Sequence, residues 1–486
     1  LVIAGFAMLF KPICKFLLSL LLLVLLLGLV TLNFVYPLTI GKTSILYSDF
    51  GKFYHSGQLF SQGKNSYSPV YCVKNKINTN ISPPHVYKSR HSKIIQLGGN
   101  LNPPFFTLIS FPFAYLSYPH ALFLWTFLSI LAGGLGILLL QQKLDPDSFS
   151  ILASLLLLIG FFSYFPSFGS LRFGQVTLLL LPLLVFGWRA AHEAKTIKAA
   201  IFLALAASLK PFIGLFLFYF VIRKQWRGLG VFIAIMLSCA LIAAAFFGLS
   251  SYLSYYHTCQ QISWAASNWN ISLYGFLLRL VGGNEHNAAL IPLPGLITFL
   301  YPLLTLLLML AMIRFLVPQT HIDFQQKTDL DFSLIIVGML LLSPLAWIYY
   351  FPFLSIPGLI LWQFSKKGIY PVALPLLLAT LILLSNIPIS LISSEKINVA
   401  NMPVVFLGAT LYFTVLLGLM GLLFRVRHYL TGQFPRHFER IPPSLLLLIA
   451  FIIFLPSLQG IAKASHNWIL NAAHYSKEYS FVSHQD

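Results

Sequence analysis

Apolar stretches of about 20 residues recur along almost the whole chain, and most of the loops between them are short and basic. A helix needs about 20 mostly apolar residues to cross a bilayer, because its backbone N–H and C=O groups cannot bond to water there. Only 9% of the residues are charged, against about 25% in soluble domains. The sequence therefore predicts an all-α polytopic membrane protein, and it excludes soluble, disordered and disulfide-rich secreted classes.

About thirteen stretches are predicted to be transmembrane helices. They are 16–36, 120–141, 148–165, 175–188, 196–209, 211–222, 228–247, 291–315, 332–347, 350–364, 370–386, 403–424 and 443–460. Residues 105–117 are too short for a full span and are interpreted as interfacial or half-inserted. The short pair around Lys210-Pro211 predicts a hairpin that reaches only partway, which is tolerated where it is buried in protein or lines a cavity.

Positive charge indicates the side of each loop. Lys11 and Lys15 precede the first span, and an N-terminus on the cytoplasmic side places most Lys and Arg of the short loops there as well. The net charge of +19 is then explained by membrane topology and anionic lipid, without nucleic acid. Two large loops, 37–118 and 248–290, and a tail at 461–486 are predicted to face outward.

Asp49 is the best-placed carboxylate on the predicted outer side. It is the only acid of the first outer loop, and aromatic residues surround it. A general base needs a carboxylate held near apolar walls, so Asp49 is a candidate for this role. The alternative is an Asp that caps a short interfacial helix. Asp329 and Asp331 are predicted to lie in a cytoplasmic loop, and Asp145-Pro146-Asp147 is interpreted as a turn, not as a metal site.

Three cations, Arg172, Lys210 and Arg279, lie at helix ends inside apolar stretches. Such a cation either binds a partner, for which a lipid phosphate or pyrophosphate is suited, or extends to the membrane interface. The aromatic and polar runs 263–270 and 343–350 also have two interpretations. Trp and Tyr favour membrane interfaces, and they also stack on sugar rings. Cys72 and Cys259 are both predicted outside, and the sequence does not show whether they pair.

Several short motifs follow one another on the predicted outer side. In chain order they are Asp49, Tyr54, Gly63…Tyr67-Ser68-Pro69, Asn102-Pro103-Pro104-Phe105-Phe106, Arg172-Phe173-Gly174-Gln175-Val176-Thr177, Ala207-Ser208-Leu209-Lys210-Pro211, Asn270-Ile271-Ser272-Leu273 and Ser343-Pro344-Leu345-Ala346-Trp347. The set resembles glycosyltransferase family 87 over about residues 45 to 365. The usual phrases of that family are a Tyr-Pro-Pro start, Gly-Gln-Val-Asn, a Leu-Lys-Pro hairpin and Ser-Pro-x-Ser-Trp.

The resemblance implies a GT-C fold with a large first periplasmic loop that contains interfacial helices. It implies inverting transfer of a mannose-like hexose from a polyprenyl-phosphate sugar to a lipid or glycan acceptor, with no cofactor and no metal. The location implied is the bacterial inner membrane, with the active site facing the periplasm or exterior. Residues 1–365 would form the catalytic module, 366–460 further transmembrane helices and 461–486 an outer tail.

The resemblance also implies roles for individual residues. Asp49 would be the general base. The residues implied for the donor phosphate are Lys210, Arg172 and Arg279, and those for sugar or acceptor are Gln175, Tyr54, Asn270, Trp347, Tyr349, Tyr350 and His257.

Four positions depart from the family pattern. Tyr349 and Tyr350 stand where the family often has His, Ala346 replaces the second serine of its motif, and Thr177 replaces Asn. A mechanism that needs an imidazole near Trp347 would have to take it from another outer histidine, such as His257.

Two other functions remain open from the sequence. A flippase or transporter of lipid-linked sugars is disfavoured because no internal repeat is visible. An O-antigen ligase or polymerase would use a pyrophosphate donor and would favour more outer arginines than the sequence has.

Overall fold

The structure is a computed structural model of the chain. The described residues are 2–35, 49–68, 70–74, 86–87, 94–97, 99–147, 149–260, 262, 264–283, 289–317, 322–389, 402–432 and 479–481. The predicted span 443–460, nearly all of the tail 461–486 and the outer acids Glu285, Glu395, Glu478 and Asp486 lie outside them.

The described part of the chain is built mainly of helices. They are α1 (Val2–Val30), α3 (Asp49–Ser61), α4 (Pro104–Ser110), α5 (Tyr118–Leu144), α6 (Ile151–Ser163), α7 (Phe165–Arg172), α8 (Thr177–His192), α9 (Thr196–Leu209), α10 (Phe216–Ile222), α11 (Trp226–Phe247), α12 (Ser250–Gln260), α13 (Leu273–Leu277), α14 (Ile297–Leu316), α15 (Phe324–Leu342), α16 (Ser355–Lys366), α17 (Ala373–Ser385) and α19 (Met402–Leu430). Short 3-10 or π-helical segments are η1 (Thr31–Val35), η3 (Phe111–Tyr115), η4 (Pro211–Leu215), η5 (Trp264–Ala266), η6 (Leu278–Gly282), η7 (Pro294–Leu296) and η8 (Ile348–Leu354).

Within the described ranges, five helices are long and apolar enough to cross a membrane. They are α1, α5, α11, α14 and α19, and the bent pair α6–α7 makes six if it counts as one span. The other predicted spans up to residue 386 coincide with helices that are shorter or carry more charge. The chain is thus a polytopic membrane protein, while the number of thirteen spans stays a prediction.

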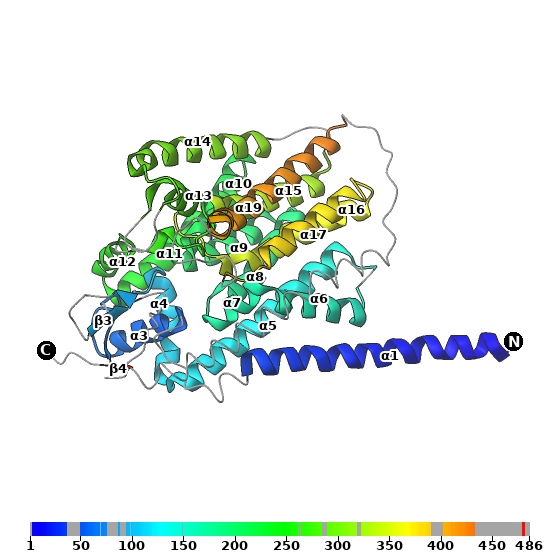
Figure 1. Cartoon of the computed structure of the whole chain (residues 1–486), viewed down its shortest axis with the longest axis horizontal. Helices are drawn as coiled ribbons and strands as arrows, with labels where there is room; N and C mark the ends of the chain where they lie inside the picture. The colour runs from blue at the N-terminus through cyan, green and yellow to red at the C-terminus, as the bar shows by residue number, and fades with distance from the viewer. Residues whose placement is uncertain are drawn as a thin grey trace.

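The central helices pack side by side around a continuous apolar core. α9 lies between α8 and α11, and α8 also packs against α5. α1 runs along one edge of the bundle (Figure 1) and contacts α6. Most of its apolar side chains from residue 16 onward are exposed, as expected for a helix that borders lipid.

One end of the bundle carries the segments that follow the first span. Figure 1 shows α3, α4 and α12 gathered there beside the small sheet. The sheet has the order β2 (Val86–Tyr87), β3 (Ile94–Leu97), β1 (Val70–Lys74) and β4 (Tyr479–Phe481). Since β4 pairs with β1, residues 479–481 lie beside β1, at the same end of the molecule. We call this end of the bundle the α3 end.

A sharp break separates α6 from α7. The two helices are bent by 65°, and Pro166 occupies the first turn of α7, where its missing N–H is tolerated. α7 was not expected from hydropathy, which predicted one span ending at 165. The bend turns the chain inward and directs the end of α7 toward α3.

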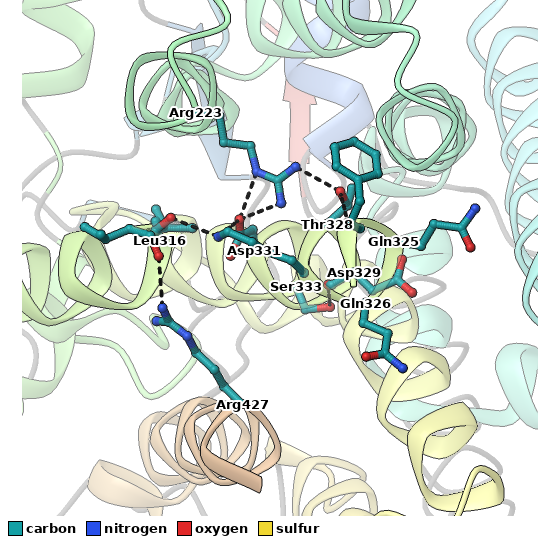
Figure 2. A network of polar contacts seen from close by, with 12 residues as sticks. Arg223, Leu316, Gln325, Gln326, Thr328, Asp329, Asp331, Ser333 and Arg427 are labelled. Carbon is teal, nitrogen blue, oxygen red and sulfur yellow. Dashed lines mark hydrogen bonds and ion pairs between the residues drawn. The ribbon is translucent and has the colours of Figure 1, made fainter. Parts of the chain in front are cut away.

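The prediction that Asp329 and Asp331 lie in a loop is wrong. Both lie inside α15 and are buried, at 8% and 1% exposure. The helix begins early because Asp323 caps it, accepting bonds from the backbone N–H groups of Gln325 (2.9 Å) and Gln326 (3.3 Å). Figure 2 shows Arg223, which lies outside the helix, bonded to Asp331.

The partners of Asp329 and Asp331 form a buried polar network. Arg223, just after α10, donates to Asp331 from Nε (2.9 Å) and from a terminal nitrogen (2.8 Å), and also to Thr328 (2.9 Å). Lys327 bonds Asp331 at 2.7 Å, and Trp188 donates to Asp329 at 2.8 Å. Because each buried charge has an opposite charge or donor, the early start of α15 is tolerated.

Candidate active site

The turn after α7 fixes the position of α3. The carbonyl of Phe173 accepts hydrogen bonds from the backbone N–H groups of Asp49 (2.7 Å) and Phe50 (3.2 Å). Gly174 follows in the left-handed region with φ of +65°, and a Cβ there would lie 2.5 Å from the Cβ of Phe50. Its carbonyl accepts a bond from Trp125 at 2.9 Å. Only glycine fits this turn, and through it the start of α3 is held against the end of α7.

The same turn brings Gln175 to Asp49. The amide nitrogen Nε2 of Gln175 donates to Oδ2 of Asp49, and the ammonium of Lys52 bonds Oδ1 at 2.8 Å. Gln175 is 4% exposed, and its amide oxygen Oε1 is buried and accepts no bond from the described residues. Both carboxylate oxygens are therefore oriented, and a buried acceptor lies beside them.

Lys210 lies at the break of the predicted hairpin. α9 ends at Leu209, Lys210 adopts an extended backbone, and Pro211 begins η4. The ammonium of Lys210, whose residue is 7% exposed, donates to the hydroxyl of Tyr350 at 3.0 Å and lies 5.3 Å from the centre of its ring. Lys210 also interacts electrostatically with Asp49. The hairpin thus presents one buried cation toward the base candidate.

η8 supplies two buried aromatic residues to the site. The ring of Tyr349 lies 4.8 Å from that of Phe173 and 6.0 Å from that of Trp269. The hydroxyl of Tyr350 accepts the hydrogen bond of Lys210. One of the two tyrosines at the family's histidine position therefore contacts Lys210, the candidate for the donor phosphate.

A cavity of about 480 Å³ opens beside Lys210. Its walls are mostly apolar and are formed by Leu101, Lys210, Pro211, Phe212, Gly214, Leu215, Phe218, Tyr255, Cys259, Met339, Leu342, Ser343, Pro344, Leu345, Trp347 and Tyr350. Lys210 is the one Lys or Arg among these lining residues. Burial raises the pKa of the Cys259 thiol and of the Tyr255 hydroxyl, so the wall from α12 is uncharged at neutral pH. The cavity combines an apolar body with a single positive charge.

Asn270 and Arg279 meet backbone groups and do not line the cavity. The Asn270 amide nitrogen donates to the carbonyls of Ala265 (2.9 Å) and Pro344 (3.0 Å), and its oxygen accepts from the backbone of Ala346 (3.2 Å). Arg279, 5% exposed, donates to the carbonyls of Ser267 and Asn270, both at 2.7 Å, and of Ala409 at 2.9 Å. Backbone bonds also join Ile271 and Trp269 to the segment at 346–348. These contacts join the two aromatic runs that the sequence singled out.

Of the remaining candidates, only Trp347 lines the cavity. Arg172 ends α7 three residues before Gln175, with its guanidinium carbon 5.5 Å from the ring centre of Phe168. The hydroxyl of Tyr54 donates to the carbonyl of Leu116 at 2.8 Å, which ties α3 to η3. His257 is exposed on α12 and is not a lining residue.

Sequence reasoning missed three polar residues of the site. Lys52, which binds Asp49, was one of many loop lysines. Tyr255 and Cys259 line the cavity from one face of α12. Their spacing of four residues was a usable signal, because residues i and i+4 share a helix face. Cys259 is a free cysteine, and the side chain of Cys72 lies outside what is described.

The comparisons with known proteins agree with the geometry. Residues 100–346 match the model of glycosyltransferase family 87, which is just over half of the chain, and the chain belongs to this family. It is therefore a membrane-embedded glycosyltransferase. The match includes Arg172, Gln175 and Lys210, whereas Asp49 precedes it. No curated protein matches the chain.

Proposed function

We propose that this glycosyltransferase moves a mannose-like hexose from a polyprenyl-phosphate sugar to a lipid or glycan acceptor. The reaction would take place at the α3 end, on the periplasmic or exterior face of a bacterial inner membrane, in a GT-C fold. Family membership supports sugar transfer over a flippase function. The observation that carries the proposal is that the buried cation Lys210 lines an apolar cavity, while Asp49, held by Gln175, lies within electrostatic range of Lys210.

The cavity suits the donor. A polyprenyl-phosphate sugar has an apolar chain, one phosphate and one sugar, and the cavity offers apolar walls with Lys210 as its cation. A Lys ammonium binds a phosphate as a point charge, and a buried position strengthens that attraction. Arg172 is proposed to assist at the phosphate from the end of α7. Trp347, which lines the cavity, is proposed to stack on the sugar.

Asp49 is proposed to act as the general base. Its carboxylate takes the proton of the acceptor hydroxyl while that oxygen attacks the anomeric carbon. The bond from this carbon to the phosphate oxygen breaks, and the lipid phosphate leaves with its charge stabilised by Lys210. A single displacement of this kind inverts the anomeric carbon.

The contacts refine the roles of the other residues. Gln175 is proposed to orient Asp49 through Nε2, while its oxygen Oε1, which accepts no bond from the described residues, accepts one from a sugar or acceptor hydroxyl. Tyr350 is proposed to position Lys210, in place of the family's histidine. Asn270 and Arg279 are proposed to brace the site from behind, since their polar atoms already bond backbone carbonyls.

The test is transfer by the purified full-length protein in detergent or liposomes. Polyprenyl-phosphate mannose and a mixture of membrane glycolipids serve as donor and acceptor, and products are identified by mass spectrometry. Asp49→Asn should reduce transfer by about 10³-fold or more, on the scale of losing a general base and its positioning. The matched control is Asp145→Asn, because Asp145 also pairs with a lysine, Lys366, away from the site.

Two results would overturn parts of the proposal. Full activity of Asp49→Asn would show that Asp49 is not the general base. Transfer from a polyprenyl-pyrophosphate sugar, with none from the monophosphate, would instead favour the ligase or polymerase type of donor.

A further inference from the structure

A second cavity lies at the opposite end of α9 from Lys210. Its volume is about 710 Å³, and it lies between the turn that joins α8 to α9 and the turn that joins α10 to α11. We call it the basic groove; its lining residues are 194–198 and 224–228. Because α9 has 14 residues, the groove is about 20 Å from Lys210 along the helix axis. It is therefore separate from the site described above.

The two turns of the groove have the same backbone geometry. Ala194 and Lys224 both adopt left-handed conformations, with φ of 57° and 54°. The following residue in each turn, Lys195 or Gln225, donates its N–H to a carbonyl five residues earlier, at 2.8 Å in both turns. Each turn leads directly into a helix, α9 or α11. Two helix N-termini therefore lie at one groove.

Those N-termini are in close contact. A Cβ on Gly228 would lie 2.5 Å from the side-chain methyl of Thr196, so the first turns of α9 and α11 touch. Neither helix has a side-chain cap at its N-terminus. Free backbone N–H groups at a helix start favour an anion, which adds to the effect of nearby side-chain charges.

The side chains of the groove are strongly cationic. Lys195, Lys198, Lys224 and Arg227 line it, and no Asp or Glu does. Glu193 lies next to the groove but pairs with Lys195 at 2.7 Å and with Lys143 at 3.2 Å. Among the described residues, no carboxylate forms an ion pair with Lys198, Lys224 or Arg227. The groove therefore has positive charge that the carboxylates of the described residues do not neutralise.

Arg223 fixes the position of the second turn of the groove. It directly precedes Lys224 but points inward to Asp331 and Thr328 (Figure 2). This contact anchors the second turn to α15. The neighbouring Lys224 is exposed and lines the groove.

The apolar surroundings indicate a lipid. Trp226 and Ile197 line the groove and are 61% and 50% exposed. Exposed apolar residues continue along α11, including Leu237 and Leu241 at 57% and 67%. Since Trp favours the membrane interface, the groove lies where α11 enters the headgroup region. An anion with an attached acyl chain fits both the charge and these surfaces.

We propose that the basic groove binds the phosphate headgroup of an anionic phospholipid, with its acyl chains along α11. Cationic pockets at helix ends are suited to such headgroups, and each Lys or Arg contributes to the attraction. The proposal is independent of the donor and acceptor of the transferase.

The test counts lipids bound to the purified full-length protein by native mass spectrometry. Phosphatidylglycerol should bind at least about fivefold more tightly than phosphatidylcholine of equal chain length. Arg227→Gln should reduce phosphatidylglycerol affinity about fivefold, and Lys198→Gln with Arg227→Gln more strongly, on the scale of one exposed cation near a charged membrane. The matched control is Arg425→Gln, an exposed cation near the end of α19 that does not line the groove, and it should leave the affinity unchanged.

The last part of the test uses inorganic phosphate as a competitor for the bound lipid. Millimolar phosphate should not displace the lipid, because the acyl chains contribute to binding. Displacement by phosphate would overturn the lipid as occupant, and so would equal binding of the two phospholipids to the wild-type protein. An equal loss of affinity in Arg227→Gln and Arg425→Gln would overturn the groove as the place of binding.

Discussion

The amide of Gln175 donates a hydrogen bond to the carboxylate of Asp49, across a separation of 126 positions in the sequence. The bond forms because the turn at Phe173 and Gly174 holds the first residues of α3. It joins a residue inside the family match to one that precedes it. Asp49 is thus oriented by a family motif even though the match does not include Asp49.

This contact predicts a positioning role for Gln175. Gln175→Leu should lower kcat about 10- to 100-fold, since a hydrogen bond to a charged group contributes about 1.5–3 kcal/mol. The KM for the donor should stay within about threefold, because Lys210 remains in place. Steady-state kinetics with the donor varied will separate the two parameters.

The control for Gln175 is Gln141→Leu. Gln141 is a half-buried amide near the C-terminal end of α5, and its oxygen accepts a bond from the hydroxyl of Ser154 on α6, away from the site. If Gln175→Leu raised KM and left kcat unchanged, Gln175 would be a donor-binding residue and not a positioning one.

Lys210 and Tyr350 form the second testable pair. Lys210→Met should remove nearly all transfer and weaken donor binding, because the cavity has no other Lys or Arg in its lining. Tyr350→Phe keeps the ring but loses the hydroxyl oxygen that accepts a hydrogen bond from Nζ of Lys210 at 3.0 Å. Its cost should be about fivefold in kcat/KM, on the scale of one hydrogen bond of about 1 kcal/mol.

A double-mutant cycle will measure this coupling. In the Lys210→Met background, Tyr350→Phe should have almost no further effect, because its partner is gone. The control is Tyr412→Phe, whose hydroxyl is bonded to the carbonyl of Ile387, away from the cavity. Additive losses at Lys210 and Tyr350 would show that the two residues act separately.

The sequence predicted the helices better than it predicted the directions of polar side chains. Hydropathy located α5, α9 and α11 to within a few residues, because each has a long apolar pattern. It could not distinguish a helical Asp from a loop Asp at 329 and 331. The pairing of Asp331 with Arg223 depends on residues 108 positions apart, which periodicity does not report.

In the candidate site, too, the sequence predicted which residues matter better than it predicted where their side chains point. The resemblance brought together Asp49, Gln175 and Lys210; the structure joins Asp49 to Gln175 by a hydrogen bond, and Lys210 lies within electrostatic range of Asp49. Asn270 and Arg279 matched the same set but bond backbone carbonyls. A polar residue between aromatic residues has the same local sequence whether it faces a ligand or a carbonyl, so only the fold separates the two cases.

Gly174 should be intolerant of any side chain. A residue with a Cβ costs about 1–2 kcal/mol in the left-handed region, and here the Cβ would also lie 2.5 Å from Phe50. Gly174→Ala should therefore lower the Tm in detergent and reduce transfer further, because α3 must move away from Gln175. Gly358→Ala is the control, since its φ is not positive and nothing lies within 4 Å of the added Cβ.

Gly358→Ala should keep activity and leave Tm equal or higher, as Ala favours a helix interior. Equal Tm values for the two alanine variants would show that the turn at Gly174 does not hold α3 as described.

The buried network around Asp331 should support stability without acting in catalysis. The side chains of Asp331 and Arg223 are only 2% and 7% exposed. Asp331→Asn leaves Arg223 and Lys327 without a full counter-charge, and breaking a buried pair costs about 3–5 kcal/mol. The Tm in detergent should fall clearly, while transfer per folded molecule stays within about twofold. Glu193→Gln removes a carboxylate from exposed pairs and should cost less than about 1 kcal/mol.

A triple variant tests the physical reason. Replacing the whole cluster with Arg223→Met, Lys327→Met and Asp331→Leu removes every buried charge at once. Its Tm should lie above that of Asp331→Asn, because the loss in the single variant comes from uncompensated charges left in an apolar interior. If the triple variant were the less stable of the two, the hydrogen bonds of Arg223 to Thr328 and of Lys327 to the Leu316 carbonyl would outweigh the charge compensation. The network would then hold α10 and α14 to α15 chiefly through these bonds.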